Sequence, residues 1–357
     1  MAERRTIVFV GMDLFPPYNE IQSKTVHMLV RNLPPEQPFR VVSFANPDAE
    51  MGAAPDARYV AAPGRSRAGS ALGLAATLVR QSWFRRALVH FVMPANYQAF
   101  VALLTWLCHV RRIPTIFTVT KRKTHALGFG TVSAVVAQTR PAYDELRGML
   151  PPDRVHLVVP GSAETVAPDA RARGKTVLFV GVPWSSSDLE RRGVFLFFDV
   201  VRETLKRDPE VRFTLLNRAL SQASLLERLT AELPPGSVEL QHGSSDRMSV
   251  WYGKHSAFLV LHGDGACPDP PLSAIEACCC GCAIVTTPFN GLARDLVVAG
   301  AGVEVAPSPQ ALAEGILTVL GDEARFRANA FELGRTQYDE RAFSAAYQRL
   351  YERLQNE

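Results

Sequence analysis

The chain has 357 residues, of which 47% are hydrophobic and 21% are charged. This composition is ordinary for a globular protein and excludes a long disordered chain. At roughly 100–200 residues per domain, the length predicts two domains, each with its own core. The formal net charge of +4 is too small for a dedicated nucleic-acid binder, so we expect no nucleic-acid partner.

Short apolar runs alternate with helical patterns through the first half of the chain. The predicted strands are Thr6–Val10, Phe39–Phe44, Tyr59–Ala61, Ala87–Met93, Pro114–Val119, Val132–Ala137 and Val155–Val159. The predicted helices include Gln22–Asn32, Ala71–Gln81, Tyr97–Val110 and Pro141–Met149. Apolar strands that alternate with helices are typical of βα units around a parallel sheet.

A polar stretch rich in Ala, Gly and Pro, Gly161–Lys175, interrupts the pattern and is interpreted as a linker. The strand pattern then restarts at Thr176–Val180, Arg212–Leu216, Val238–Gln241, Ala257–Leu261, Ala283–Thr286 and Gly302–Val305. Predicted helices are Val194–Leu205, Ser221–Glu232, Leu272–Cys280, Pro309–Leu320, Glu323–Tyr338 and Ala342–Gln355. We therefore expect an N-terminal Rossmann-like domain over residues 1–165, a second over 166–338, and a final helix within 339–357.

The targeting and cysteine patterns favour a cytoplasmic location. The first residues run directly into a predicted strand, which argues against a signal peptide. The most apolar stretch, Ala87–Val110, contains polar residues and a proline, which argues against a membrane span. Four of the six cysteines lie within Cys278–Cys282, a spacing that neither a disulfide framework nor a tetrahedral zinc site favours. We interpret them as packed free thiols and expect no metal.

The segment from Asp269 to Glu276 carries the strongest chemical signal. Pro271 is a good helix start, so the backbone N–H groups of Leu272, Ser273 and Ala274 are expected to be unpaired at the positive end of the helix dipole. Such a helix start is suited to binding a diphosphate. Glu276, one turn further, could accept hydrogen bonds from ribose hydroxyls.

The stretch from Asp269 to Pro288 resembles the signature of family 4 glycosyltransferases, and Glu276 matches its second Glu, which binds the donor ribose. Phe179-Val180-Gly181 followed by Arg192-Gly193 resembles the family's Phe-Val-Gly loop and Lys-Gly pair. The resemblance implies that Arg192 contacts the donor diphosphate and that Gly181 lies at the nucleotide. It also implies the α/β fold called GT-B, in which two Rossmann-like domains face a cleft and the C-terminal helix crosses back to the N-terminal domain.

Several positions depart from the family pattern. The first Glu of the signature, which contacts the sugar in the family, falls on Pro268. Asp269 and Asp264 are the candidates for its role. The His that usually ends the family's Thr-Val-His strand in the N-terminal domain falls on Thr120, and His90 or His125 could replace it, although a lone histidine is more often structural. His242 leaves a strand where a loop could touch the base, and it is a further candidate ligand.

The leading hypothesis is a hexosyltransferase-like enzyme that moves a sugar from a UDP-sugar or GDP-sugar to an acceptor hydroxyl. The resemblance implies retention at the anomeric carbon and no cofactor beyond the donor substrate. A non-catalytic nucleotide-sugar-binding partner subunit and a sugar-nucleotide epimerase or hydrolase remain as alternatives. The acceptor is expected to be a sugar-containing or lipid-linked small molecule.

One helical stripe bears on membrane contact. Phe100, Leu103, Trp106 and Leu107 recur at helical spacing, and we interpret them as core. If that stripe is instead exposed beside Arg111 and Arg112, it would contact a lipid-linked acceptor or the inner face of the membrane peripherally.

Overall fold

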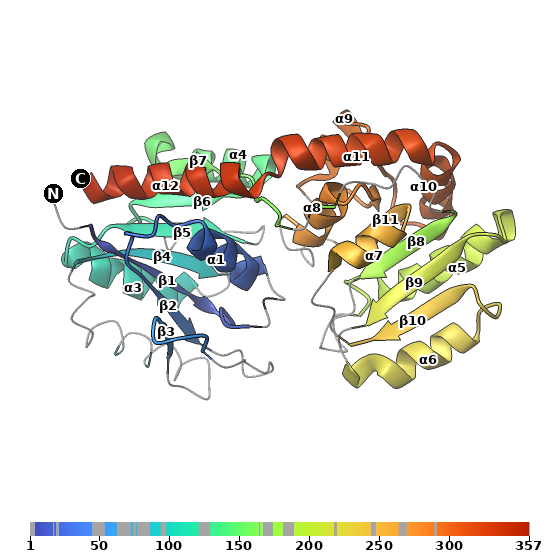
Figure 1. Cartoon of the computed structure of the whole chain (residues 1–357), viewed down its shortest axis with the longest axis horizontal. Coiled ribbons are helices and arrows are strands. Elements are labelled where there is room, and N and C mark those ends of the chain that lie inside the picture. Colours follow the sequence, from blue (N-terminus) through green and yellow to red (C-terminus); the bar gives the residue numbers. More distant parts are fainter. Residues whose placement is uncertain are drawn as a thin grey trace. The chain divides into compact units, whose positions relative to one another are not determined.

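The computed structural model describes residues 4–16, 18, 21–44, 54–62, 73, 76, 86–93, 98–120, 129–163, 165–166, 174–180, 189–217, 220–243, 248–263, 270–288 and 291–356. The chain forms two compact units (Figure 1). Unit 1 comprises Met1–Pro160 together with Glu340–Glu357, and unit 2 comprises Gly161–Asp339.

Unit 1 is built on a seven-stranded parallel sheet with the order β3-β2-β1-β4-β5-β6-β7. Its strands are β1 (Thr6–Met12), β2 (Phe39–Phe44), β3 (Tyr59–Ala61), β4 (Ala87–Met93), β5 (Thr115–Val119), β6 (Ala134–Ala137) and β7 (Val155–Leu157). Its helices include α1 (Ile21–Arg31), α3 (Gln98–Val110), α4 (Arg140–Met149) and α12 (Glu340–Asn356). The order reverses between β1 and β4, as in doubly wound Rossmann-like sheets.

Helices cover both faces of the sheet of unit 1. On one face, side chains of α3 and α4 such as Leu104 and Leu146 pack with Val89, Phe117 and Val135 of the strands. On the other face, α1 and α12 pack against a second set of strand side chains. The last helix of the chain, α12, therefore belongs to unit 1 and completes its core (Figure 1).

Unit 2 repeats the same architecture with a six-stranded parallel sheet of order β10-β9-β8-β11-β12-β13. Its strands are β8 (Thr176–Val180), β9 (Arg212–Asn217), β10 (Val238–His242), β11 (Ala257–Val260), β12 (Ala283–Thr286) and β13 (Gly302–Glu304). Its helices are α5 (Val194–Arg207), α6 (Ala223–Ala231), α7 (Met248–Lys254), α8 (Leu272–Cys279), α9 (Ala293–Val298), α10 (Pro309–Gly321) and α11 (Glu323–Gln337).

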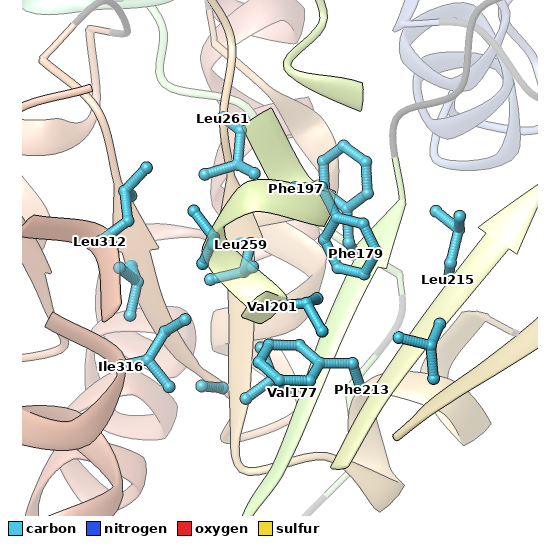
Figure 2. Close-up of a cluster of buried hydrophobic side chains, with 14 of the residues drawn as sticks. Val177, Phe179, Phe197, Val201, Phe213, Leu215, Leu259, Leu261, Leu312 and Ile316 are labelled. Atoms are coloured by element: carbon cyan, nitrogen blue, oxygen red, sulfur yellow. The ribbon is translucent and has the colours of Figure 1, made fainter. Parts of the chain in front are cut away.

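The core of unit 2 is a continuous apolar cluster between the central strands and two helices, α5 and α10 (Figure 2). Phe179 of β8 stacks on Phe197 of α5 with ring centroids 4.9 Å apart, and Phe213 of β9 meets Phe197 edge-on. Aromatic pairs of this geometry contribute roughly 0.5–1.5 kcal/mol beyond the area that they bury. This packing holds α5, and so the loop that precedes it, against the central strands.

A buried polar chain links α12 to the sheet of unit 1. His90 lies in the middle of β4 and is fully buried. Its Nδ1 lies 2.8 Å from the Tyr351 hydroxyl and its Nε2 lies 2.7 Å from Thr118 Oγ1, which in turn lies 2.8 Å from the Tyr347 hydroxyl. Because both ring nitrogens have partners, burial of this histidine leaves no orphaned polar atom. His90 is therefore a structural residue in the middle of β4, not a replacement for the family His.

Three other predictions need correction. Two short helices, α7 and α9, escape the sequence patterns because each has fewer than eight residues, too few to display a helical period. The predicted helix Ser221–Glu232 begins instead with a 3₁₀ turn, Leu220–Gln222, before α6. The stripe on α3 that was interpreted as core is partly exposed, since Leu103 and Trp106 are 48% and 52% exposed.

The stability of unit 1 should fall on acidification because His90 is buried as a neutral ring. Burial lowers its pKa to about 3, whereas an unfolded histidine titrates near 6.5. Below about pH 6.5 the unfolded state binds a proton that the folded state excludes. The stabilisation is therefore complete above that pH and is lost down to about pH 3, at up to about 1.4 kcal/mol per pH unit.

We expect His90→Gln, which keeps polar atoms but does not titrate, to reduce the difference in melting temperature between pH 7 and pH 5. Thermal unfolding of the full chain at both pH values measures this difference. His109→Gln is the matched control, because His109 is an exposed histidine of the same unit, on α3. An unchanged pH difference in His90→Gln would remove His90 as a source of the acid sensitivity.

Candidate functional site

The carboxyl ends of β8 and β11 define the centre of the candidate site in unit 2. These neighbouring parallel strands lie where the strand order reverses, and ligands of open α/β sheets bind at such a switch point. Two chain segments leave this point: one follows β8 and enters α5, and the other follows β11 and enters α8. The described residues of both segments carry the polar groups considered below.

The two segments touch through a glycine. Gly193 precedes α5 with a left-handed φ of 74°, and a Cβ placed on it would lie 2.2 Å from the Leu261 carbonyl oxygen. Only glycine allows both this conformation and this approach. The Gly263 N–H also donates to the Arg191 carbonyl oxygen at 2.8 Å. The backbone at residues 191–193 is thus held directly against residues 261–263.

This contact brings Arg192 to His262. The Arg192 Nη1 lies 3.2 Å from the His262 Nε2. A guanidinium can only donate, so Nε2 must accept and the proton of the neutral ring must lie on Nδ1. That Nδ1 is buried and has no hydrogen-bond partner among the residues that the structure describes. The pair therefore presents one partly buried cation and one buried N–H donor at the switch point.

His262 stays neutral at physiological pH. Burial, and then the adjacent positive charge of Arg192, lower its pKa to about 3. The His262 carbonyl oxygen also accepts a hydrogen bond of 2.8 Å from Thr287 Oγ1, which holds the backbone at this position. A fixed neutral donor beside a cation is suited to an anionic ligand, because neither group must change its protonation state on binding.

The N-terminus of α8 supplies two further donors. The helix begins at Leu272 with Pro271 as its N-cap, and no side chain caps it. Within the described part of the chain, the N–H groups of Leu272 and Ser273 have no acceptor. The Ala274 N–H, expected to be unpaired, instead donates to the Pro271 carbonyl oxygen at 2.9 Å, because the first turn is tight. Two amides rather than three remain for a ligand.

Glu276 lies in the second turn of α8 and is only 6% exposed. The Tyr252 hydroxyl donates to its Oε2 at 3.3 Å, and Tyr252 is itself buried at 1% exposure on α7. The carboxylate is therefore held by a rigid aromatic neighbour rather than projected into solvent. A buried carboxylate of this kind can accept further hydrogen bonds with little loss of side-chain freedom.

His242 ends the edge strand β10, at the same carboxyl edge of the sheet. Its Nδ1 lies 3.0 Å from Asn217 Nδ2 at the end of β9, and its Nε2 lies 3.6 Å from Glu227 Oε1. Between β10 and β11 lie β9 and β8, so strand spacing alone separates His242 from the Arg192–His262 pair by about 14 Å. His242 belongs to the outer part of this edge, not to its centre.

Several predicted residues lie outside the described residues: Asp264, Asp269, Pro268, Gly181 and His125. Thr120 is described, and it belongs to unit 1, where it directly follows β5. Its Oγ1 is buried and unpartnered among the described residues, and the same is true of both amide atoms of Gln138, which follows β6. Since Val119 pairs with Ala137, Thr120 and Gln138 are the next residues of two neighbouring strands.

Sequence reasoning missed His262, Tyr252 and Gln138. His262 follows the apolar run of β11, so a His immediately after a predicted central strand was the available signal. Tyr252 lies on α7, which is too short to be predicted. Gln138 follows a predicted strand but belongs to no motif.

The cysteine cluster is buried. Cys278, Cys279, Cys280 and Cys282 form no disulfide. Burial raises the pKa of the Cys279 thiol to about 12. The described residues contain no group of three or more His, Cys, Asp or Glu side chains that could hold a metal ion.

Comparison with known proteins finds a match within unit 2. Residues 174–322 match the family model for group 1 glycosyl transferases. No match was found among curated proteins.

Solved structures similar to the whole chain include three bacterial proteins. The HepE protein of Anabaena in complex with UDP has 13% identity, covers 98% of this chain and 100% of its own, and gives a TM-score of 0.69. Sucrose-phosphate synthase of Thermosynechococcus elongatus has 13% identity, coverage of 98% and 99%, and a TM-score of 0.71. A glycosyltransferase of Rickettsia africae has 12% identity, coverage of 98% for both chains, and a TM-score of 0.68. The fold is therefore GT-B, as the sequence predicts.

Gly193→Ala should destabilise unit 2 and displace Arg192. The added Cβ would lie 2.2 Å from the Leu261 carbonyl oxygen, and a left-handed alanine costs roughly 1–2 kcal/mol before any clash. Gly236→Ala is the matched control, because Gly236 has a φ of 75° but nothing within 4 Å of the added Cβ. Thermal unfolding of both variants isolates the clash from the backbone strain. Equal losses of melting temperature would show that the close approach to Leu261 has no energetic role.

Proposed function

We propose that this chain, whose second unit matches the family model for group 1 glycosyl transferases, transfers a sugar from a nucleotide diphosphate-sugar to an acceptor hydroxyl. The observation that carries the proposal is the Arg192–His262 pair at the carboxyl ends of β8 and β11, together with the uncapped start of α8, the helix that follows β11 in the chain. One cation and three unpaired N–H donors of the described residues are suited to a diphosphate. HepE was solved in complex with UDP and with UDP-glucose, which supports a uridine donor here.

The proposed chemistry depends on stabilising the negative charge that develops on the leaving diphosphate. As the bond between the anomeric carbon and the phosphate oxygen breaks, negative charge develops on that oxygen. Arg192 and the amides of Leu272 and Ser273 would stabilise this charge without moving, because the backbone already fixes them. The arrangement supplies the positive charge from the protein itself, so we propose that the reaction uses no cofactor and no metal.

The proposed contacts to the rest of the nucleotide-sugar follow from the position of each residue along the carboxyl edge of the sheet. Glu276, held by Tyr252, would accept hydrogen bonds from the ribose hydroxyls. His242, about 14 Å from the centre by strand spacing, would lie toward the base. Gly181, Asp264 and Asp269, outside the described residues, stay candidates for contact with the diphosphate and the sugar.

The acceptor is proposed to use unit 1. Buried polar atoms are rarely left unpaired unless water or a ligand satisfies them, and Thr120 and Gln138 present three such atoms on neighbouring strand ends. A hydroxyl-rich acceptor could satisfy both residues. Retention of anomeric configuration and membership of glycosyltransferase family 4 are part of the same proposal and rest on the signature around Glu276. A cytoplasmic location, where nucleotide-sugars would be available, is also proposed, and it rests on the cysteine pattern of the sequence.

A nucleotide screen tests donor binding. A ligand that binds only the folded state at about one hundred times its Kd adds about 2.7 kcal/mol of stability, which corresponds to roughly 5–10 °C in melting temperature for a unit of this size. We expect UDP and a UDP-sugar to raise the melting temperature, with GDP and dTDP as comparisons. Failure of every nucleotide to stabilise the chain would contradict the proposal. Stabilisation without product formation for any donor would favour a non-catalytic binding subunit, which the absence of a carboxylate at Pro268 motivates.

Two substitutions test the site residue by residue. Arg192→Gln removes a charged hydrogen bond worth about 1.5–3 kcal/mol, so the Kd for the diphosphate should rise roughly 10- to 100-fold. Arg191→Gln, a change of the adjacent exposed arginine, should leave the Kd near that of the wild type.

Glu276→Gln keeps the size of the side chain and should weaken binding of UDP while hardly affecting binding of inorganic diphosphate. Calorimetric titration measures all of these affinities. Equal weakening of UDP and diphosphate by Glu276→Gln would argue against a ribose contact.

A further inference from the structure

The outer face of α3 in unit 1 exposes a row of large apolar side chains. Leu103, Trp106 and Val110 are 48%, 52% and 60% exposed. Their spacing of three and four residues places them on one face of the helix. The opposite face is also apolar, since Leu104 and Cys108 pack into the core of the unit. A helix that is apolar on both its buried face and its exposed face is typical of burial on both sides or of contact with lipid.

The end of α3 adds two exposed arginines. The Ile113 N–H donates to the Cys108 carbonyl oxygen at 2.9 Å and the Arg112 N–H to the His109 carbonyl oxygen at 3.0 Å, which is a Schellman closure. Arg112 occupies its left-handed position, with a φ of 56°. Glycine is the usual residue there, because other side chains are strained in this conformation. A cation is thus placed beside the apolar row at a position where glycine would be the less strained choice.

The sequence around α3 is rich in basic residues and contains no acidic residues that would balance their charge. Between Ala57 and Tyr143 the chain contains twelve Arg and Lys residues and no Asp or Glu. The other 27 basic residues are accompanied by all 35 acidic residues of the chain. The modest net charge of +4 therefore conceals a strongly cationic segment, and α3 lies within it. Among the described residues, Arg111 and Arg112 form no ion pair with an acidic group.

We propose that the outer face of α3, defined by Leu103, Trp106, Val110, Arg111 and Arg112, docks on an anionic phospholipid surface. The apolar side chains would enter the boundary between headgroups and acyl chains, where tryptophan is favoured, and the arginines would contact lipid phosphates. A nucleic acid would use the cations but would leave the apolar row in water, which is why a lipid surface fits better. No described helix is long and apolar enough to cross a bilayer, so the contact is peripheral.

This inference goes beyond the proposed function and does not depend on it, because docking requires neither donor binding nor transfer. It concerns unit 1 alone, whereas the donor residues Arg192, His262 and Glu276 belong to unit 2. Docking would hold the unit at a surface that presents lipid-linked hydroxyls.

Vesicle sedimentation with the full chain tests the proposal. We expect binding to phosphatidylcholine vesicles that contain phosphatidylglycerol, and weak binding to phosphatidylcholine alone. Each arginine near an anionic surface changes affinity by about fivefold, so Arg111→Gln with Arg112→Gln should weaken binding roughly 25-fold. Leu103→Ser with Trp106→Ser should weaken it at least tenfold. Equal binding of the wild type to neutral and anionic vesicles would overturn the proposal.

Arg112→Gly separates docking from stability. Because it relieves a left-handed side chain, this variant should melt no lower than the wild type and yet bind anionic vesicles about fivefold more weakly. Matched controls lie in unit 2. Val297→Ser with Val298→Ser changes two exposed apolar residues of α9, and Arg325→Gln with Arg335→Gln changes two exposed arginines of α11.

The outcomes on the controls decide the assignment. The unit 2 variants should bind vesicles as the wild type does. Losses equal to those of the α3 variants would mean that attraction is spread over the whole surface, and would overturn the proposal. Loss of binding to a duplex oligonucleotide in the arginine variants, with unchanged vesicle binding, would instead assign the surface to nucleic acid and would also overturn it.

Discussion

The close approach of Gly193 to the Leu261 carbonyl oxygen is the constraint on which the candidate site depends. It allows the segment before α5 to lie directly on the segment after β11, so that Arg192 and His262 meet. The stacked rings of Phe179 and Phe197 hold α5 on the sheet and so help to maintain this close approach (Figure 2). A side chain at residue 193 would have to separate the two segments, and the cation would then leave the switch point. The proposed binding of a diphosphate therefore depends on a glycine, with no side chain, at residue 193.

Two buried histidines illustrate how the same residue type takes different roles. His90 and His262 are both neutral because burial lowers each pKa to about 3. Both ring nitrogens of His90 have hydrogen-bond partners, and these bonds join α12 to the sheet. His262 uses one nitrogen on Arg192, and within the described residues the other is left without an acceptor. A buried hydrogen-bond donor without a partner in the protein is expected where a ligand supplies the acceptor.

The two units share one architecture but differ in surface character. Unit 1 contains a long segment without acidic residues and an exposed apolar helix face, whereas unit 2 contains the Arg192–His262 pair and the uncapped start of α8. We propose a different kind of recognition for each unit. The difference resides in side chains at strand ends and on one helix, not in the topology of the sheets, which is why shared fold alone does not identify a substrate.

The sequence by itself determined the alternation of strands and helices and most element boundaries. It also indicated the residues expected to bind a nucleotide. Apolar periodicity and local motifs such as Pro271 before Leu272 are local properties, so they can be predicted without the fold. Only the tertiary structure decided that His262 partners Arg192, that Tyr252 holds Glu276 and that the Ala274 amide is occupied. These contacts join segments far apart in the chain. Only the structure also distinguishes His90, whose two ring nitrogens both have partners, from His262. It shows in addition that the α3 face, which periodicity had assigned to the core, is exposed. A residue's period along a helix indicates which neighbours share its face, but whether that face meets protein or solvent depends on what the rest of the chain packs against it.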